Sequence, residues 1–153
     1  MQIKVEIPNL KRMQKAMSEA PQDMYREANT AIHSSIYKIE QQAIQESPID
    51  TGRLRGSIHQ GIVWGPLYGA VGPTVKYAYW VHEGTDPHII SVRNKKVLYS
   101  RKRGIFFGKR VRHPGTKKNQ FMIRARDQSQ NEINKFFKDA LERVVNNIAR
   151  RSK

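Results

Sequence analysis

The chain has 153 residues and no cysteine, so it can form neither disulfide bonds nor thiolate metal sites. It also lacks any apolar run of about 18 residues, the length that a membrane-spanning helix needs. The first four residues, M-Q-I-K, do not begin an apolar block of signal-peptide length, and we expect no export by that route. No glycine-rich phosphate loop and no nucleophile elbow is present. The absence of cysteine fits a protein of the reducing cytosol. The absence of both motifs gives no support to a phosphate-loop nucleotide-binding enzyme or to a hydrolase with a nucleophile elbow.

Acidic residues are missing from one long stretch. The chain has 28 Lys and Arg against 13 Asp and Glu, a formal net charge of +15. Between Pro87 and Arg126 there are 13 basic residues and no acidic one, whereas the rest of the chain is nearly neutral. A solvated charged face usually mixes both signs, so this stretch is expected to face an anionic partner. Nucleic acid, an acidic protein face and a membrane surface all have that chemistry.

The first third of the chain is expected to be mostly helical. Residues 2–7 alternate in polarity, which predicts a short strand. Ser18 and Pro21 indicate a helix break and a fresh start. From Gln22 to Glu46 the apolar residues recur with the period of an α-helix, so a long amphipathic helix is predicted there.

Residues 47–58, S-P-I-D-T-G-R-L-R-G-S-I, connect this helix to a predicted sheet. Pro48 disfavours the α conformation in the residue before it, so the helix should end at its start. Asp50 and Thr51 can accept hydrogen bonds from nearby backbone N–H groups, and Gly52 can supply a positive φ. A tight turn is therefore expected.

Alternating polarity from Arg53 onwards predicts a strand that ends at Trp64, with Leu54 on its apolar face. A turn at 65–69 and a second strand at 70–75 would complete a hairpin.

The next segment, 77–85, is rich in aromatic residues, and we expect a short helical or extended stretch that ends at Gly84. Tyr77, Tyr79 and Trp80 could stack on nucleic-acid bases. Such clusters more often lie in a core or a subunit interface, which is the interpretation preferred here.

Residues 88–112 contain three apolar bursts separated by basic turns, which predicts a projecting basic β-hairpin arm with mobile, charged tips. The basic residues of this predicted arm are Arg93, Lys95, Lys96, Arg101, Lys102, Arg103, Lys109, Arg110 and Arg112.

A final amphipathic helix is predicted over roughly 121–150, with its apolar face packed on the sheet. Ser129 and Glu132 match a capping box, so the helix could instead begin there. The fold class that follows is α+β, a single domain over 1–153 with an antiparallel sheet packed by a long helix from the first half and the C-terminal helix.

Two residue sets could be taken for catalytic or metal sites. Asp50-Thr51-Gly52 spells the aspartic-protease triplet, but that chemistry needs it at the end of an apolar strand in an all-β fold. It follows a helix and a proline here, so we interpret it as a turn. His82, Glu83, His88 and His113 are all zinc-ligand types, but their spacing matches no helical metal motif. We expect no catalysis, no metal and no cofactor.

Four blocks occur in an order that resembles a known family. They are S-P-I-D-T-G-R-L-R-G-S-I (47–58), V-G-P-T-V-K-Y-A-Y-W-V-H-E-G-T (71–85), H-P-G-T-K-K-N-Q-F-M (113–122) and the closing helix. Together they resemble the tail-completion, or head–tail joining, proteins of tailed bacteriophages, also described as minor tail components. Gln120 stands where that family usually has proline, and the arm is longer than its minimal pattern.

The resemblance implies a non-enzymatic virion protein, assembled in the host cytoplasm, that forms a ring, expected to be a hexamer, joining the neck to the tail tube. Its partners would be copies of itself, the neck and head-completion proteins, and the tail tube or tail terminator, with the DNA inside the ring as a further candidate. The alternative is a free-standing basic nucleic-acid-binding protein. The motif or subunit-interface residues that the resemblance implies are Asp50, Thr51, Gly52, Arg53, Leu54, Tyr77, Tyr79, Trp80, Glu83, Gly84, Thr85 and Phe121.

Overall fold

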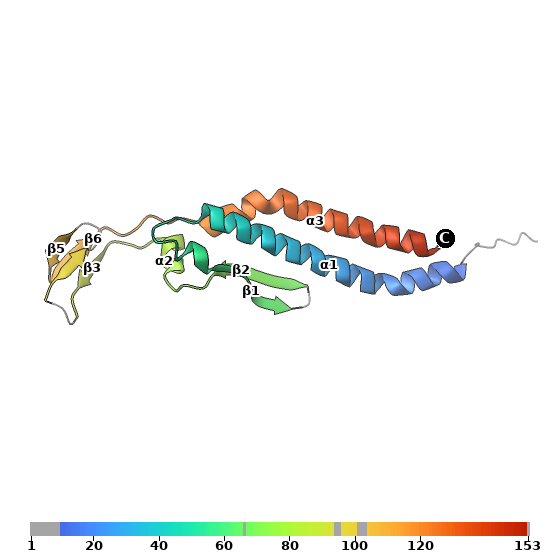
Figure 1. Ribbon diagram of the computed structural model, residues 1–153, viewed down its shortest axis with the longest axis horizontal. Helices are drawn as coiled ribbons and strands as arrows, with labels where there is room; N and C mark the ends of the chain where they lie inside the picture. Colours follow the sequence, from blue (N-terminus) through green and yellow to red (C-terminus); the bar gives the residue numbers. More distant parts are fainter. Residues whose placement is uncertain (1–9, 66, 94–95, 101–103, 153) are drawn as a thin grey trace, which may run out of the picture. The chain divides into compact units, whose positions relative to one another are not determined.

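The computed structural model describes residues 10–65, 67–93, 96–100 and 104–152 and has the predicted α+β class (Figure 1). The chain divides into two compact units. One comprises Val75–Phe121 and is called the strand unit below. The other is built from the described residues on either side of it and is called the helical unit. The predicted strand at 2–7 lies outside the described residues.

Two long helices, α1 (Leu10–Glu46) and α3 (Phe121–Ser152), lie side by side in the helical unit (Figure 1). Charged pairs join them along their length and show that they run antiparallel. Arg124 lies 2.7 Å from Glu46 at one end of the pair, Arg143 lies 2.6 Å from Glu27 midway along α1, and Arg151 lies 3.5 Å from Glu19 further on. Most of the buried apolar side chains on the two helices are small. The buried alanines are Ala16, Ala20, Ala31, Ala43, Ala125 and Ala140.

The charged pairs shift the pKa values of two of their members. The pKa of Glu46 is lowered, chiefly by the hydrogen bond from Arg124 and then by that from Gln128. The pKa of Arg151 is raised, chiefly by its hydrogen bonds to the carboxylate of Asp23. Asp23 is buried, and Arg151 donates to both of its oxygens, so the guanidinium satisfies a carboxylate that has left water.

The predicted break at Pro21 is wrong, because α1 runs through it from Leu10 to Glu46. A proline inside a helix removes one hydrogen-bond donor and kinks the helix rather than always ending it. Ala20 and Asp23 on either side are both buried, so packing holds the helix at this point. The first turns of α1 (dark blue in Figure 1) accordingly run in a different direction from the rest.

The hairpin predicted after the turn is confirmed, but its first strand begins later than expected. Residues Arg55–Ser57 form a short 3₁₀ helix, η1, and β1 (Ile58–Gly65) follows. It pairs antiparallel with β2 (Tyr68–Pro73), and this two-stranded sheet contacts α1. The hydroxyl of Ser57 donates to the carbonyl of Leu54 at 2.7 Å, a local bond that competes with a strand.

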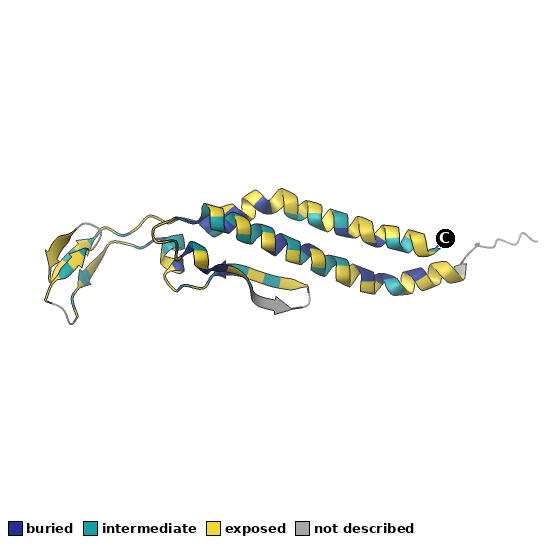
Figure 2. Cartoon of the chain, viewed as in Figure 1, coloured by how far each residue is buried: buried dark blue, intermediate teal, exposed yellow. Residues whose placement is uncertain are grey.

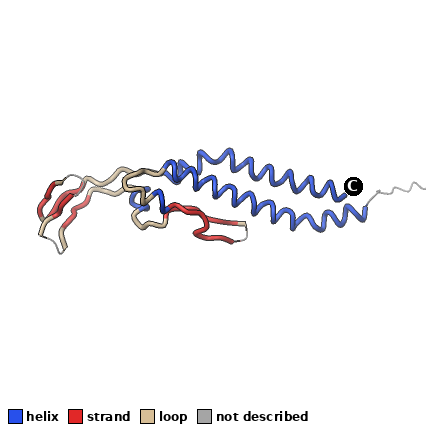
Figure 3. The backbone as a smooth tube through the Cα atoms, in the orientation of Figure 1, coloured by secondary structure: helices blue, strands red, loops and turns tan. Residues whose placement is uncertain are grey.

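The described residues of the strand unit form one short helix, α2 (Ala78–Glu83), and four short strands. Strand β3 (His88–Ser91) pairs with β6 (Arg110–His113), and β4 (Leu98–Ser100) pairs with β5 (Ile105–Gly108), all antiparallel. Loops connect α2 to β3 and β6 to α3 (tan in Figure 3). The three apolar segments predicted within residues 88–112 correspond to β3, β4 and β5. Strand β6, in which two of four residues are arginine, was not predicted.

The start of α3 at Phe121 is confirmed, and the alternative start at the capping box is wrong. Ser129 lies inside the helix, buried, and its hydroxyl donates to the carbonyl of Ala125 at 2.7 Å. The apolar face of α3 lies against α1, since the buried Ala140 and Val144 line a groove with Met24 and Ala28 of α1. The expectation that this face packs on the sheet is therefore wrong. Within the described residues, no helix combines the length and the apolarity that crossing a membrane requires.

Candidate interaction surfaces

The motif turn after α1 has the geometry that its residues predict. Gly52 has φ 79°, and the carbonyl of Gly52 accepts the backbone N–H of Gly56 at 2.9 Å. The Thr51 hydroxyl is a distant acceptor for the N–H of Arg53, at 3.5 Å. Asp50 is exposed in this turn. The turn shapes the chain between α1 and β1; it does not end a strand, so the arrangement of an aspartic protease is not formed.

A second motif turn closes the strand unit. Gly84 ends α2 with φ 78°, which confirms the predicted glycine stop. Thr85 follows and forms an isolated antiparallel bridge with Thr116, with backbone N–H to carbonyl distances of 3.0 Å in both directions. Gly115 has φ 86° on the opposite side of the bridge. The block 113–122 thus meets the block 71–85, although their sequences did not indicate which residues would pair.

The aromatic residues of α2 are exposed, so they do not form a core. Tyr79 and Trp80 are 62% and 57% exposed, and their rings meet edge to face with centroids 5.0 Å apart. Tyr77 is also exposed. His82, also on α2, contacts the fully buried Phe121, with the two ring centroids 5.6 Å apart. The subunit-interface and base-stacking interpretations therefore both remain predictions.

The four possible metal ligands do not come together as one site. Nδ1 of His82 lies 2.8 Å from a carboxylate oxygen of Glu83. His88 and His113 face each other across β3 and β6 with ring centroids 5.0 Å apart. Nδ1 of His113 accepts the N–H of Gly115, and Nδ1 of His88 is bonded to the carbonyl of Asp86. Among the residues with described positions, no three His, Asp or Glu side chains are grouped as metal ligands.

The basic residues of the predicted arm lie partly on strands and not only at tips. Arg110 and Arg112 alternate along β6, and Lys109 precedes that strand directly. All three are exposed, as are Arg93 and Lys96. Lys95, Arg101, Lys102 and Arg103 lie outside the described residues.

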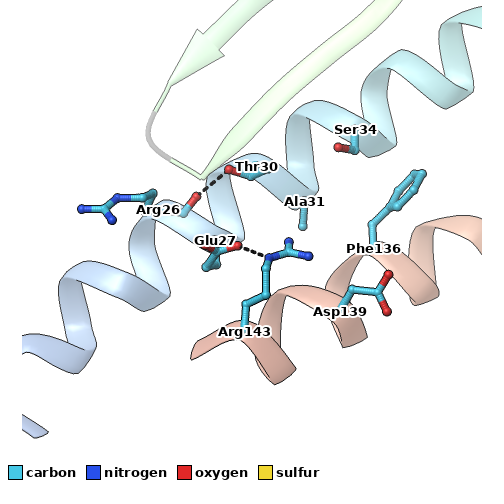
Figure 4. Close-up of a pocket in the computed structure, with 8 residues that line it drawn as sticks. All are labelled: Arg26, Glu27, Thr30, Ala31, Ser34, Phe136, Asp139 and Arg143. Atoms are coloured by element: carbon cyan, nitrogen blue, oxygen red, sulfur yellow. Dashed lines mark hydrogen bonds and ion pairs between the residues drawn. The ribbon is translucent and has the colours of Figure 1, made fainter. Parts of the chain in front are cut away.

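A cleft of about 420 Å³ lies between α1 and α3 (Figure 4). Its walls carry both charged and apolar side chains. Arg143 bonds Glu27 across the cleft, and the Thr30 hydroxyl donates to the backbone carbonyl of Arg26 within α1. The arrangement holds two helices together and presents no nucleophile beside a base.

A smaller groove on the same pair of helices is almost entirely apolar. Its volume is about 260 Å³, and Met24, Phe137 and Leu141 line it together with buried Val144. Met24 and Leu141 are more than half exposed, as is Val145 one turn further along α3. Phe137, predicted to be covered, is 42% exposed. The helical period identified these residues as apolar, but it could not show that part of the face would stay uncovered.

Comparison of the chain with models of protein families, with curated proteins and with solved structures gives no match.

Proposed function

We propose that this protein is a structural virion subunit of a tailed bacteriophage, a tail-completion or head–tail connector protein that assembles into a ring between the neck and the tail tube. The proposal starts from the four sequence blocks that resemble that family. Two observations on those blocks support a structural role. Gly52 and Gly84 both have a positive φ, and Phe121 is fully buried. These motif residues therefore shape turns and packing and do not line a reaction site.

The main support for ring assembly is an exposed apolar surface on the helical unit. This surface, called the apolar flank, consists of Met24, Phe137, Leu141 and Val145. All four side chains are at least 42% exposed. Soluble monomers rarely expose a continuous apolar patch of this kind, and such patches mark contacts with other molecules. Copies of the same chain are the partners that a ring provides, because every subunit presents the flank to a neighbour.

The proposed protein is not an enzyme and uses no metal or cofactor. Its partners are copies of itself, the neck and head-completion proteins, and the tail tube or tail terminator. The alternative function is a basic nucleic-acid-binding protein that acts without assembly, and the exposed cations of the strand unit are the feature that favours it.

The proposal is tested by the mass and shape of the purified protein, measured by light scattering and electron microscopy. Rings are expected, and Leu141→Glu combined with Val145→Glu should convert them to monomers with unchanged helix content. Lys135→Glu, an exposed change on another side of α3, is the matched control and should leave the rings intact. In the phage or prophage that carries the gene, its deletion should yield heads and tails that do not join.

A protein that stays monomeric at all concentrations, and whose deletion leaves virions complete, would contradict the proposal. If that monomer binds DNA with a steep dependence on salt, the alternative function is supported instead.

A further inference from the structure

The sheets of the strand unit have no core of their own. None of the residues of β3, β4, β5 and β6 is buried, and Figure 2 shows these strands in the colours of exposed and intermediate residues. Ile89 is 59% exposed and Phe106 is 68% exposed. An isolated two-stranded hairpin is marginally stable at best in water. The two-stranded sheets β3–β6 and β4–β5, with uncovered apolar residues, are expected to gain stability when a partner covers them.

Apolar and basic side chains share the exposed surface of these strands. Across the β3–β6 sheet, Ile89 is directly opposite Arg112 and Ser91 is opposite Arg110, so these side chains point to the same face. In the β4–β5 sheet Tyr99 is opposite Phe106, and their rings lie 4.7 Å apart, both more than half exposed. The exposed strands of this unit therefore carry aromatic and aliphatic groups as well as guanidinium groups.

The cations of this unit are not neutralised within it. Val75–Phe121 contains 12 basic residues and two acidic ones, Glu83 and Asp86. Glu83 is bonded to His82. Among the described part of this unit, none of the Lys and Arg side chains forms an ion pair, and all of them are exposed. Those side chains are Lys76, Arg93, Lys96, Lys109, Arg110, Arg112, Lys117 and Lys118.

We propose that the strands β3–β6 dock on an acidic protein surface that has an apolar centre. The phosphate backbone of a nucleic acid would match the cations, but it offers no apolar surface for Ile89 and Phe106. Protein interfaces combine aromatic residues and arginine at their centre, as this surface does. This inference states the chemistry of the partner that binds the strand unit. It rests on the proposed function in one respect, that this partner is a protein of the virion neck or tail.

A second copy of this chain does not supply the acidic surface. The sequence outside the strand unit, Met1–Thr74 and Met122–Lys153, is itself net positive, with 16 basic and 11 acidic residues. Several of its carboxylates are bonded within the chain, namely Glu19, Asp23, Glu27, Glu46 and Glu132. The partner is therefore a different protein.

Binding of three fluorescent probes to the full chain tests this inference. The probes are a peptide of alternating Glu and Leu, a poly-glutamate peptide of equal length, and a short DNA duplex. The Glu–Leu peptide should bind most tightly and should slow amide hydrogen exchange over β3–β6. Arg110→Glu with Arg112→Glu should abolish this binding. Ile89→Ser with Phe106→Ser should weaken it by about tenfold or more, to the level of poly-glutamate. Lys135→Glu, a cation of the helical unit, is the control and should change nothing.

Three results would overturn the inference. The first is equal binding of the two peptides, which would mean that charge alone is recognised. The second is tightest binding of the DNA duplex, unaffected by the Ile89 and Phe106 changes, which would assign the surface to nucleic acid. The third is no protection of the strand amides by the Glu–Leu peptide in the wild-type chain. Light scattering of the same samples distinguishes failure of this inference from failure of the proposed function. If rings are present together with any of these three results, the inference is wrong but the proposed function is not contradicted.

Discussion

Thr85 and Thr116 are hydrogen-bonded to each other through both their main chains and their side chains. Each backbone N–H donates to the carbonyl of the other at 3.0 Å, and their hydroxyl oxygens also lie 3.0 Å apart. The two residues are 31 positions apart, and β3 to β6 all lie between them in sequence. Because those strands have no buried residue, this bridge is expected to contribute much of the order of the strand unit.

Gly115→Ala is expected to open this bridge. An added Cβ would overlap the carbonyl oxygen of Thr85 and would lie 3.0 Å from the carbonyl carbon of Asp86, and φ is 86°. The positive φ alone costs about 1–2 kcal/mol, and the collision adds to it. Gly108→Ala is the matched control, because its φ is 77° but its Cβ would enter open space. Amide exchange over β3–β6 should accelerate more in Gly115→Ala; equal effects would show that the collision is relieved at no cost.

Gly52→Val should destabilise the helical unit more than any conservative change at Thr51. A Cβ on Gly52 meets no atom within 4 Å, so the cost comes from its φ of 79° alone. About 1–2 kcal/mol is expected for Ala, and more for β-branched Val. Thr51→Ser keeps a hydroxyl at its weak 3.5 Å contact and should change little. Urea unfolding measures the difference, with Gly56→Ala, which has neither a positive φ nor a close neighbour, as the control.

Two phenylalanines of α3 are expected to respond in opposite ways to truncation. Phe121 is fully buried, so Phe121→Ala should cost about 3–5 kcal/mol in the free energy of unfolding. Phe137 is 42% exposed, so Phe137→Ala should cost less than about 2 kcal/mol in the monomer. Phe137→Ala should instead weaken ring assembly. A large loss of monomer stability in Phe137→Ala would mean that the side chain is covered without any partner.

Acid should weaken the contact between α1 and α3 at Glu46. The pKa of Glu46 lies below its ordinary value of 4.5, chiefly because Arg124 donates a hydrogen bond to the carboxylate. A lowered folded-state pKa means that this stabilisation is fully present above the unfolded-state value and is lost as the pH falls through the folded-state value. Arg124→Gln should therefore flatten the fall in unfolding free energy between about pH 5 and pH 3. Arg126→Gln, whose ion pair is with the adjacent Asp127, should keep the wild-type slope.

Local chemistry made several elements predictable. Pro48 correctly indicated that the long helix ends at Glu46, and Gly52 and Gly84 have the positive φ that their positions in the turns suggested. The start of α3 at Phe121 was predicted as well. In each case the signal comes from the residue itself or its immediate neighbours.

Contacts between distant residues account for what the sequence did not reveal. Pro21 and Ser129 both carry strong boundary signals, but buried neighbours keep each inside a helix. The helical period showed that α3 has an apolar face, yet it could not show that the partner would be α1 and not a sheet. Nor could it show that Leu141 would remain 60% exposed while Val144, on the adjacent turn, is covered.

The pairs between α1 and α3 also favour one longitudinal alignment of the two helices. The paired residues are equally spaced on the two helices: Glu19 and Glu27 are eight positions apart on α1, and their partners Arg151 and Arg143 are eight positions apart on α3. The same match holds from Lys38 to Glu46 and from Arg124 to Glu132.

Small alanine side chains could tolerate sliding, since they provide few projections to interlock. A slip by one turn, about 5.4 Å, would separate these pairs. In one direction it would bring Glu27 opposite Asp139 and Lys15 opposite Arg151. The charge sequence therefore selects the alignment that the alanine contacts leave undetermined, and with it the placing of Phe137 and Leu141 beside Met24.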